Sequence, residues 1–274
     1  MEIKHLAATP IDTVMECFFE SFQNYFVTLP TDLEYWKNRF NNVKVDWSLS
    51  FGAFEEEKLM GFIINGIDVH NGQLTAYNTG TGVLPEYRGQ QLVDRIYAEA
   101  IPEFKKNGVE KCLLEVIVEN EPAKKVYERI GFSIVRDLLS FSGDLDLLPE
   151  AKMPEKTAFS EILATGLYRP EHYCWESRAE AVQMDEKMTS SFVVRDSTGK
   201  ISGYFILGQA GNIVQLQEKQ GDFSSLLDSI AKVEQQVKLK NLASDRVQII
   251  SELEKRGFKN LINQHEMEMQ LDNF

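Results

Sequence analysis

The stretch Val83-Leu-Pro-Glu-Tyr-Arg-Gly-Gln-Gln-Leu-Val93 joins a segment with the pattern of a β-strand to a segment with the pattern of a helix. Apolar and small residues alternate from Leu74 to Gly82 before it. The apolar residues after it recur at helical spacing: Leu92, Val93, Ile96, Tyr97, Ala100 and Ile101. We therefore predict a turn that ends at a helix N-terminus.

This turn is a candidate binding site for an anion. The first N–H groups of a helix have no intrahelical acceptor, and the helix dipole favours negative charge at that end. The amides from Arg88 to Gln91 are therefore candidates to bind a pyrophosphate without a metal ion. The Arg88 guanidinium would add a charge-assisted hydrogen bond. An Arg-Gly pair at a helix start is more often a plain surface turn, so a second signal is needed.

The second signal is the segment Asn120-Glu-Pro-Ala-Lys-Lys-Val-Tyr-Glu-Arg-Ile-Gly-Phe132, which follows a strand-like run from Cys112 to Val118. Pro122 suits the first turn of a helix, and Gly131 suits its end. Together the two segments resemble motifs A and B of the GNAT superfamily of N-acetyltransferases. Their pairing at this separation is more specific than either motif alone, and the resemblance covers Ala8 to Phe141.

The resemblance implies that acetyl-CoA, as acyl donor, lies in a V-shaped split between the strand ending near Val83 and the strand Cys112–Val118. It implies that Asn120 faces the pantetheine arm and that Tyr127 lies beside the CoA sulfur as general acid. A half-buried helix aromatic is the alternative for Tyr127. Gln91 and Val93 stand where motif A usually has small residues. The residues that the resemblance assigns to acetyl-CoA are Val83, Leu84, Arg88, Gly89, Gln90, Gln91, Leu92, Val93, Asn120 and Tyr127.

An alkylamine acceptor is mostly protonated near neutral pH, so a transferase needs a group that accepts its proton. Removing that proton from a Lys-like amine costs roughly 4–5 kcal/mol. The strand Thr75–Gly82 contains no carboxylate, which leaves Glu115 and Asp68 as candidates, acting directly or through water. We take Glu115 as the candidate base, although both residues are equally compatible with ordinary solvated carboxylates.

Composition limits the protein class. A chain of 274 residues suits two modules, and 43% hydrophobic with 26% charged residues is ordinary for a globular protein. No apolar run is long enough to cross a bilayer, and residues 1–5 lack the order of a secretion signal, so a cytoplasmic location is expected. The net charge of −13 argues against nonspecific nucleic-acid binding.

The cysteines and histidines give no sign of a metal site. The three cysteines are far apart and lack Cys-x-x-Cys spacing, so they are expected to be reduced and mostly buried. The four histidines are equally scattered. No metal ion is therefore expected.

The order of predicted elements indicates a mixed α/β module. A short strand at Ile3–Leu6 precedes two helices, one with the stripe Val14, Cys17, Phe18, Phe22 and Phe26 and one that begins after Thr31-Asp32. These stripes are more often core than part of an acceptor cleft. Strands are predicted at Trp47–Glu55, Leu59–Ile67, Leu74–Gly82, Val109–Val118 and Phe132–Phe141, with an Asn71-Gly72 turn and helices between the later ones.

The remaining sequence is a weaker echo of the first module. Ser191–Asp196 and Ile201–Ile206 repeat the pattern of Phe51–Ile64, and Leu253–Phe258 repeats Tyr127–Phe132. We predict tandem GNAT-like modules, each a mostly antiparallel sheet flanked by helices, at residues 1–145 and 146–274. The second module lacks the Arg-Gly turn and has Leu253 in place of Tyr127 and Arg246 in place of Asn120, so it is predicted to hold no acetyl-CoA.

The sequence thus predicts an N-acetyltransferase that moves an acetyl group from acetyl-CoA to a primary amine by direct attack, with Tyr127 and Glu115 as catalytic residues. The amine and the oligomeric state are not specified by the sequence. The alternative is a noncatalytic acyl-CoA-binding or regulatory protein.

Overall fold

The computed structural model describes residues 1–23 and 25–271 and divides the chain into two compact units. Unit 1 comprises Met1–Val135 with Glu266–Phe274, and unit 2 comprises Arg136–His265. The predicted boundary after residue 145 therefore does not coincide with the division between the units. The C-terminal segment belongs to unit 1 rather than to the second module. No helix among the described residues is both long and apolar enough to span a bilayer.

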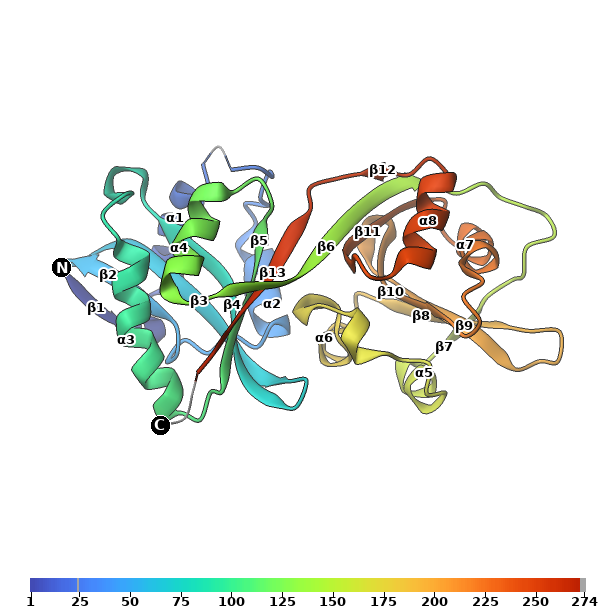
Figure 1. Ribbon diagram of the computed structural model, residues 1–274, viewed down its shortest axis with the longest axis horizontal. Helices are drawn as coiled ribbons and strands as arrows, with labels where there is room; N and C mark the ends of the chain where they lie inside the picture. Colours follow the sequence, from blue (N-terminus) through green and yellow to red (C-terminus); the bar gives the residue numbers. More distant parts are fainter. Residues whose placement is uncertain (24, 272–274) are drawn as a thin grey trace. The chain divides into compact units, whose positions relative to one another are not determined.

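Unit 1 contains a sheet with helices on both faces (Figure 1). Its strands, in spatial order, are β1 (Glu2–His5), β2 (Phe51–Glu55), β3 (Lys58–His70), β4 (Gln73–Val83), β5 (Lys111–Ile117) and β13 (Gln264–Gln270). Its helices are α1 (Ile11–Ser21), α2 (Leu33–Asn42), α3 (Leu92–Lys106) and α4 (Glu121–Ile130), with short 3-10 turns η1 (Leu6–Ala8) and η2 (Pro85–Tyr87). β1 to β4 are antiparallel neighbours, whereas β4 and β5 are parallel.

Unit 2 repeats this arrangement. Its strands, in spatial order, are β7 (Glu155–Thr157), β8 (Ser190–Arg195), β9 (Ile201–Leu207), β10 (Asn212–Glu218), β11 (Gln236–Ala243) and β6 (Ser133–Asp144), and β12 (Lys259–Asn260) also pairs with β6. Its helices are α5 (Phe159–Ala164), α6 (Ala179–Met184), α7 (Phe223–Ala231) and α8 (Val247–Lys255), with 3-10 turns η3 (Pro170–His172), η4 (Trp175–Ser177) and η5 (Gln209–Gly211). β10 and β11 form the parallel pair, which matches β4 and β5. The predicted tandem fold is confirmed.

Each face of the unit 1 sheet is covered by its own hydrophobic cluster. α1 and α2 pack on one face with Phe62 and Ile64 of β3, and α3 and α4 pack on the other face with Ile63. Because successive strand residues point to opposite faces, neighbouring apolar residues in β3 serve different clusters. The near-continuous apolar run of β3 therefore reflects a strand that is covered on both sides.

Local signals placed most boundaries correctly. Asn71 and Gly72 both have positive φ, as the turn of a tight hairpin requires, and they join β3 to β4. The Asp32 carboxylate accepts a hydrogen bond from the Glu34 N–H and caps α2. The prediction that a strand begins at Trp47 was wrong, because the Asp46 carboxylate accepts hydrogen bonds from the N–H and hydroxyl of Ser48 and holds a turn there.

The last strand of each sheet comes from the other half of the sequence. β6 follows α4 of unit 1 but pairs with β11, and its Phe141 lies in the unit 2 core. β13 follows α8 of unit 2 but lies beside β5, as Figure 1 shows in red and green. Met267 and Met269 of β13 are buried in the unit 1 core, and Glu268 forms a 2.7 Å ion pair with Lys111 of β5.

We predict that Met267→Ala destabilises unit 1 by about 2–4 kcal/mol, because it leaves a cavity around a fully buried side chain. Urea unfolding should show the loss, and hydrogen exchange should show faster opening of β5 amides than of β8 and β9 amides. Gln270→Ala is the matched control, since this β13 side chain is exposed. Loss of protection confined to unit 2 would contradict the strand exchange.

Candidate active site

The candidate site begins where β4 and β5 part. Their parallel pairing runs only from Thr75 opposite Lys111 to Asn78 opposite Leu114, although both strands continue. The register of β4 against β3 shifts next to Asn78 and leaves Thr79 as an extra residue. Such a bulge bends a strand and increases its twist, which explains the separation. Within the described residues, the β5 side of β4 beyond Thr79 has no strand partner.

The turn after β4 presents backbone amides at the start of α3. The Leu84 N–H donates to the Met60 carbonyl, and Pro85–Tyr87 forms the 3-10 turn η2. Gly89 and Gln91 both have positive φ, 76° and 56°. Gln91 thus adopts the left-handed conformation that Gly takes most easily, and its side chain is exposed. The backbone from Gly89 to Leu92 therefore forms the predicted N-terminal turn despite the Gln.

Arg88 lies in this turn but points away from the helix N-terminus. Its Nε donates to the Val83 carbonyl at 3.3 Å, and its Nη2 donates to the Ser21 carbonyl at 2.8 Å. The guanidinium therefore fastens the turn to the end of β4 and to α1. In this arrangement Arg88 is a positioning residue, whereas the sequence predicted a direct bond to pyrophosphate.

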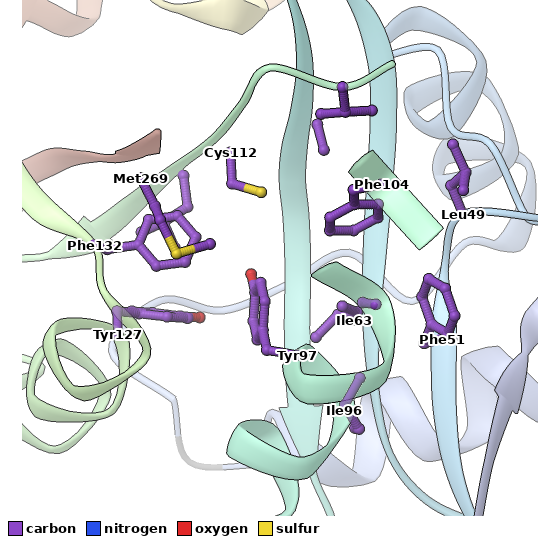
Figure 2. Packing of buried hydrophobic residues seen from close by; sticks show 14 of the residues in the cluster. Leu49, Phe51, Ile63, Ile96, Tyr97, Phe104, Cys112, Tyr127, Phe132 and Met269 are labelled. Atoms are coloured by element: carbon purple, nitrogen blue, oxygen red, sulfur yellow. The ribbon is translucent and has the colours of Figure 1, made fainter. Parts of the chain in front are cut away.

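Tyr127 of α4 is 8% exposed and lies below the split. Figure 2 shows its hydroxyl directed toward Tyr97, with Phe132 and Met269 beside its ring. Burial raises the pKa of Tyr127 to about 12, and a hydrogen bond with the Thr81 side chain opposes this rise. The phenol is therefore protonated at any physiological pH.

Polar groups continue from Tyr127 into the sheet. The Asn78 Nδ2 donates to Tyr97 Oη at 2.9 Å and to Thr81 Oγ1 at 2.8 Å. Burial raises the pKa of Tyr97 well above its ordinary value. The residues that surround Tyr127 thus form a neutral hydrogen-bonded row, which can donate to a developing anion without holding a charge of its own.

The raised pKa of Tyr127 limits what this residue can do as an acid toward a thiolate. A thiol has a pKa of about 8.5, so complete proton transfer from a phenol with a pKa of about 12 to a thiolate is uphill by roughly 5 kcal/mol. The interpretation of Tyr127 as a full proton donor is therefore less suitable than a role as hydrogen-bond donor to the leaving sulfur.

Asn120 caps α4, since its Oδ1 accepts a hydrogen bond from the Ala123 N–H at 3.3 Å. Burial raises the pKa of Tyr25, which lies between α1 and α2, and the Asn120 side chain opposes this rise. Tyr25 in turn lies near enough to Tyr127 to influence its pKa. The predicted helical stripe extended to Phe26, but α1 ends at Ser21, and Tyr25 lies in the loop that follows.

The two candidate bases are in different positions. Glu115 directly follows the last paired residue of β5, and its Oε2 accepts a hydrogen bond from the Tyr77 hydroxyl at 2.7 Å. It lies on the α1–α2 face, because Leu114 and Val116 point into the α3 cluster. Asp68 lies opposite Thr75, at the far end of the ladder, in a 2.7 Å ion pair with Lys44. Glu115 is thus the one at the split.

In unit 2, β10 and β11 also pair over a short stretch, but a different side chain, that of Arg246, lies against β10. The described β10–β11 pairing covers only two residue pairs. Arg246 occupies the N-cap position of α8, as Asn120 does in α4, but without a capping hydrogen bond from its side chain, and it is 7% exposed. Its guanidinium donates to the Leu216 carbonyl and to the Gln217 side chain of β10, each at 3.0 Å. Leu253, fully buried in the core, replaces Tyr127.

Comparison with known proteins agrees with this geometry. Residues 11–132 match the family described as Acetyltransferase (GNAT) family. N-alpha-acetyltransferase 30 of Schizosaccharomyces pombe is 34% identical over 84 residues, which are 30% of this chain and 56% of that protein. Mycothiol acetyltransferase of Corynebacterium aurimucosum is 36% identical over 93 residues, which are 33% of this chain and 30% of that protein. The chain thus spans about half or less of each relative.

Solved structures match the whole chain. A tandem GNAT protein from the clavulanic acid biosynthesis pathway has a TM-score of 0.72 at 13% identity. The match covers 100% of this chain and 99% of that one. A GCN5-related N-acetyltransferase from Sphaerobacter thermophilus has a TM-score of 0.68 at 14% identity, covering 99% of this chain and 96% of that one. The fold is therefore that of tandem GNAT proteins. By sequence, residues 11–132 match the GNAT family of acetyltransferases.

We predict that Gln91→Gly stabilises the protein by a few tenths to about 1 kcal/mol, because it removes a side chain from a left-handed position. Gln90→Gly is the matched control and should destabilise by about 0.5 kcal/mol, since it only adds unfolded-state freedom. Urea unfolding of both variants provides the measurement. Equal destabilisation by both would show that Gln91 is not strained.

Proposed function

We propose that unit 1 transfers an acetyl group from acetyl-CoA to a primary amine. The separation of β4 from β5, which leaves one side of β4 unpaired above a turn rich in backbone amides, carries this proposal. The GNAT match over residues 11–132 supports acyl transfer. Two relatives are themselves named as acetyltransferases, although each matches only part of this chain.

The described residues suit an acyl-CoA ligand. The free edge of β4 up to Val83 and Leu84 would accept the pantetheine amides in the manner of an added strand. The amides from Gly89 to Val93 would bind the pyrophosphate at the start of α3. Arg88 would hold this turn in place through Val83. Asn120 would face the pantetheine arm from the opposite side of the split.

Glu115 would accept the proton of the amine, directly or through one water molecule. Tyr77 donates to one carboxylate oxygen of Glu115 and orients the group. The amine nitrogen would attack the thioester carbon, the new C–N bond would form and the C–S bond would break. The sulfur would leave as a thiolate that accepts a hydrogen bond from Tyr127, and the amine proton would pass to Glu115.

Unit 2 would support the fold without a second acyl-CoA site. Arg246 reaches from α8 to the carbonyl of Leu216, where the equivalent part of unit 1 would accept pantetheine. Leu253 offers no hydroxyl to a leaving sulfur. The alternative for the whole chain is a noncatalytic acyl-CoA-binding protein, which would use the same split of unit 1 without turnover.

Binding and turnover separate these functions. We expect calorimetry to give one acetyl-CoA per chain, and incubation with a panel of polyamines, aminoglycosides, amino acids and peptides to release thiol with at least one class. Arg246→Ala should leave the stoichiometry at one. Binding without thiol release would favour the noncatalytic alternative, a stoichiometry of two would overturn the role of unit 2, and absence of binding would overturn the proposal.

We predict that Tyr127→Phe lowers kcat about 10²-fold and leaves acetyl-CoA affinity within about threefold, because it removes one hydrogen-bond donor to developing charge. Since the pKa of Tyr127 is raised to about 12, the ratio of wild-type to variant kcat should stay constant from pH 7 to about pH 10. Glu115→Gln is the contrasting variant, and its kcat should recover as rising pH deprotonates the amine. A pH-dependent ratio for Tyr127→Phe would contradict the neutral-donor role.

A further inference from the structure

Unit 2 contains a turn that corresponds, by strand register, to the turn before α3 in unit 1. In unit 1, Gly61 of β3 lies opposite Val83, the last residue of β4. In unit 2, Gly203 of β9 lies opposite Glu218, the last residue of β10. The residue after each strand then donates its N–H across the hairpin at 2.9 Å, to the carbonyl of the residue before the glycine. Glu218 therefore stands where unit 1 has Val83.

The turn of unit 2 already holds a carboxylate. The Glu218 Oε2 accepts hydrogen bonds from the Gln220 N–H and, at 2.9 Å, from the Asp222 N–H, directly before α7. Glu218 is 9% exposed, so this carboxylate lies within the turn rather than in solvent. Backbone amides that converge on one anion at the start of a helix form the kind of site that binds phosphate. In unit 2 the anion at this site is part of the chain.

We propose that Glu218 is a built-in anion that closes unit 2 to the pyrophosphate of acyl-CoA. This inference rests on the proposed function, in which the turn before α3 binds that pyrophosphate. The side chain of Val83, at the same register position in unit 1, can accept no hydrogen bond from its turn. A carboxylate in the chain is always present beside its turn, so it competes strongly with a free anion. A pyrophosphate that approached Glu218 would also meet like charge in a mostly buried place.

A second side chain closes the neighbouring part of β10. The Arg246 guanidinium donates to the carbonyl of Leu216, which precedes Glu218 on the same strand. By register Leu216 corresponds to Thr81, on the part of β4 that would accept pantetheine. One acidic and one basic side chain of unit 2 thus take the positions that pyrophosphate and pantetheine occupy in the proposal for unit 1. The expected single acyl-CoA per chain then follows from internal contacts, since the fold itself is repeated.

The test is hydrogen exchange of the full chain, read by mass spectrometry, with and without inorganic pyrophosphate at constant ionic strength. We expect pyrophosphate to protect residues 88–95 of the wild type and to leave residues 219–225 unchanged. In Glu218→Ala, the Gln220 and Asp222 amides should exchange at least about tenfold faster, because each loses a hydrogen bond to a charged group. Pyrophosphate should then slow this exchange at least about threefold, because the turn is open to an external anion.

Two further variants serve as controls. Glu218→Gln keeps an oxygen that accepts from the turn amides, so its residues 219–225 should not respond to pyrophosphate. Glu234→Ala is the matched control, because the Glu234 Oε1 accepts the Gln236 N–H in another turn of unit 2. It should leave the exchange of residues 219–225 unchanged, with or without pyrophosphate.

The outcomes separate this inference from the proposed function. Protection of residues 219–225 by pyrophosphate in the wild type, or no response in folded Glu218→Ala, would overturn the role of Glu218. If Glu218→Ala unfolds unit 2, pyrophosphate must restore its protection where chloride at equal ionic strength does not, and failure to do so would overturn that role as well. Absence of protection in residues 88–95 of the wild type would instead count against pyrophosphate binding by unit 1.

Discussion

The bulge at Thr79 is the constraint on which the candidate site depends. Pairing of β4 with β5 ends just before this extra residue, although β5 continues to Ile117. The bulge also sets which side chains face α3, because Asn78 and Thr81 then lie on the same side as Tyr127. The hydrogen-bonded row beneath the split is therefore a consequence of one backbone irregularity.

Close packing on the opposite face keeps the bent end of β4 in place. A Cβ added at Gly82 would lie 2.5 Å from the Phe62 ring and 2.9 Å from Ser21, so only Gly permits this approach. Arg88 bonds to the Ser21 carbonyl as well. The end of α1 thus supports both the strand and the turn.

The exchange of β6 and β13 makes each unit depend on the other half of the sequence. Met269 packs near Gly131 and belongs to the same cluster as Tyr127, and Lys111 loses its ion-pair partner if Glu268 is removed. Breaking a buried pair leaves an uncompensated charge, which is strongly destabilising. The two halves therefore differ in chemistry, since unit 1 has Asn120 and Tyr127 where unit 2 has Arg246 and Leu253. Both halves remain necessary for the fold.

The sequence by itself determined much of the local structure and the resemblance of residues 11–132 to the GNAT family. Strand alternation, the Asn71-Gly72 turn, the Asp32 cap and the Gly131 helix end each act within a few residues, so they can be read directly from the chain. The echo of Tyr127–Phe132 in Leu253–Phe258 also indicated two similar folds. Only the tertiary structure decided the pairing of β6 and β13, because identical strand patterns suit either sheet and partners distant in sequence leave no local signal. The same reason hid the hydrogen bond of Arg88 to the Ser21 carbonyl and the hydrogen bond between Tyr77 and Glu115.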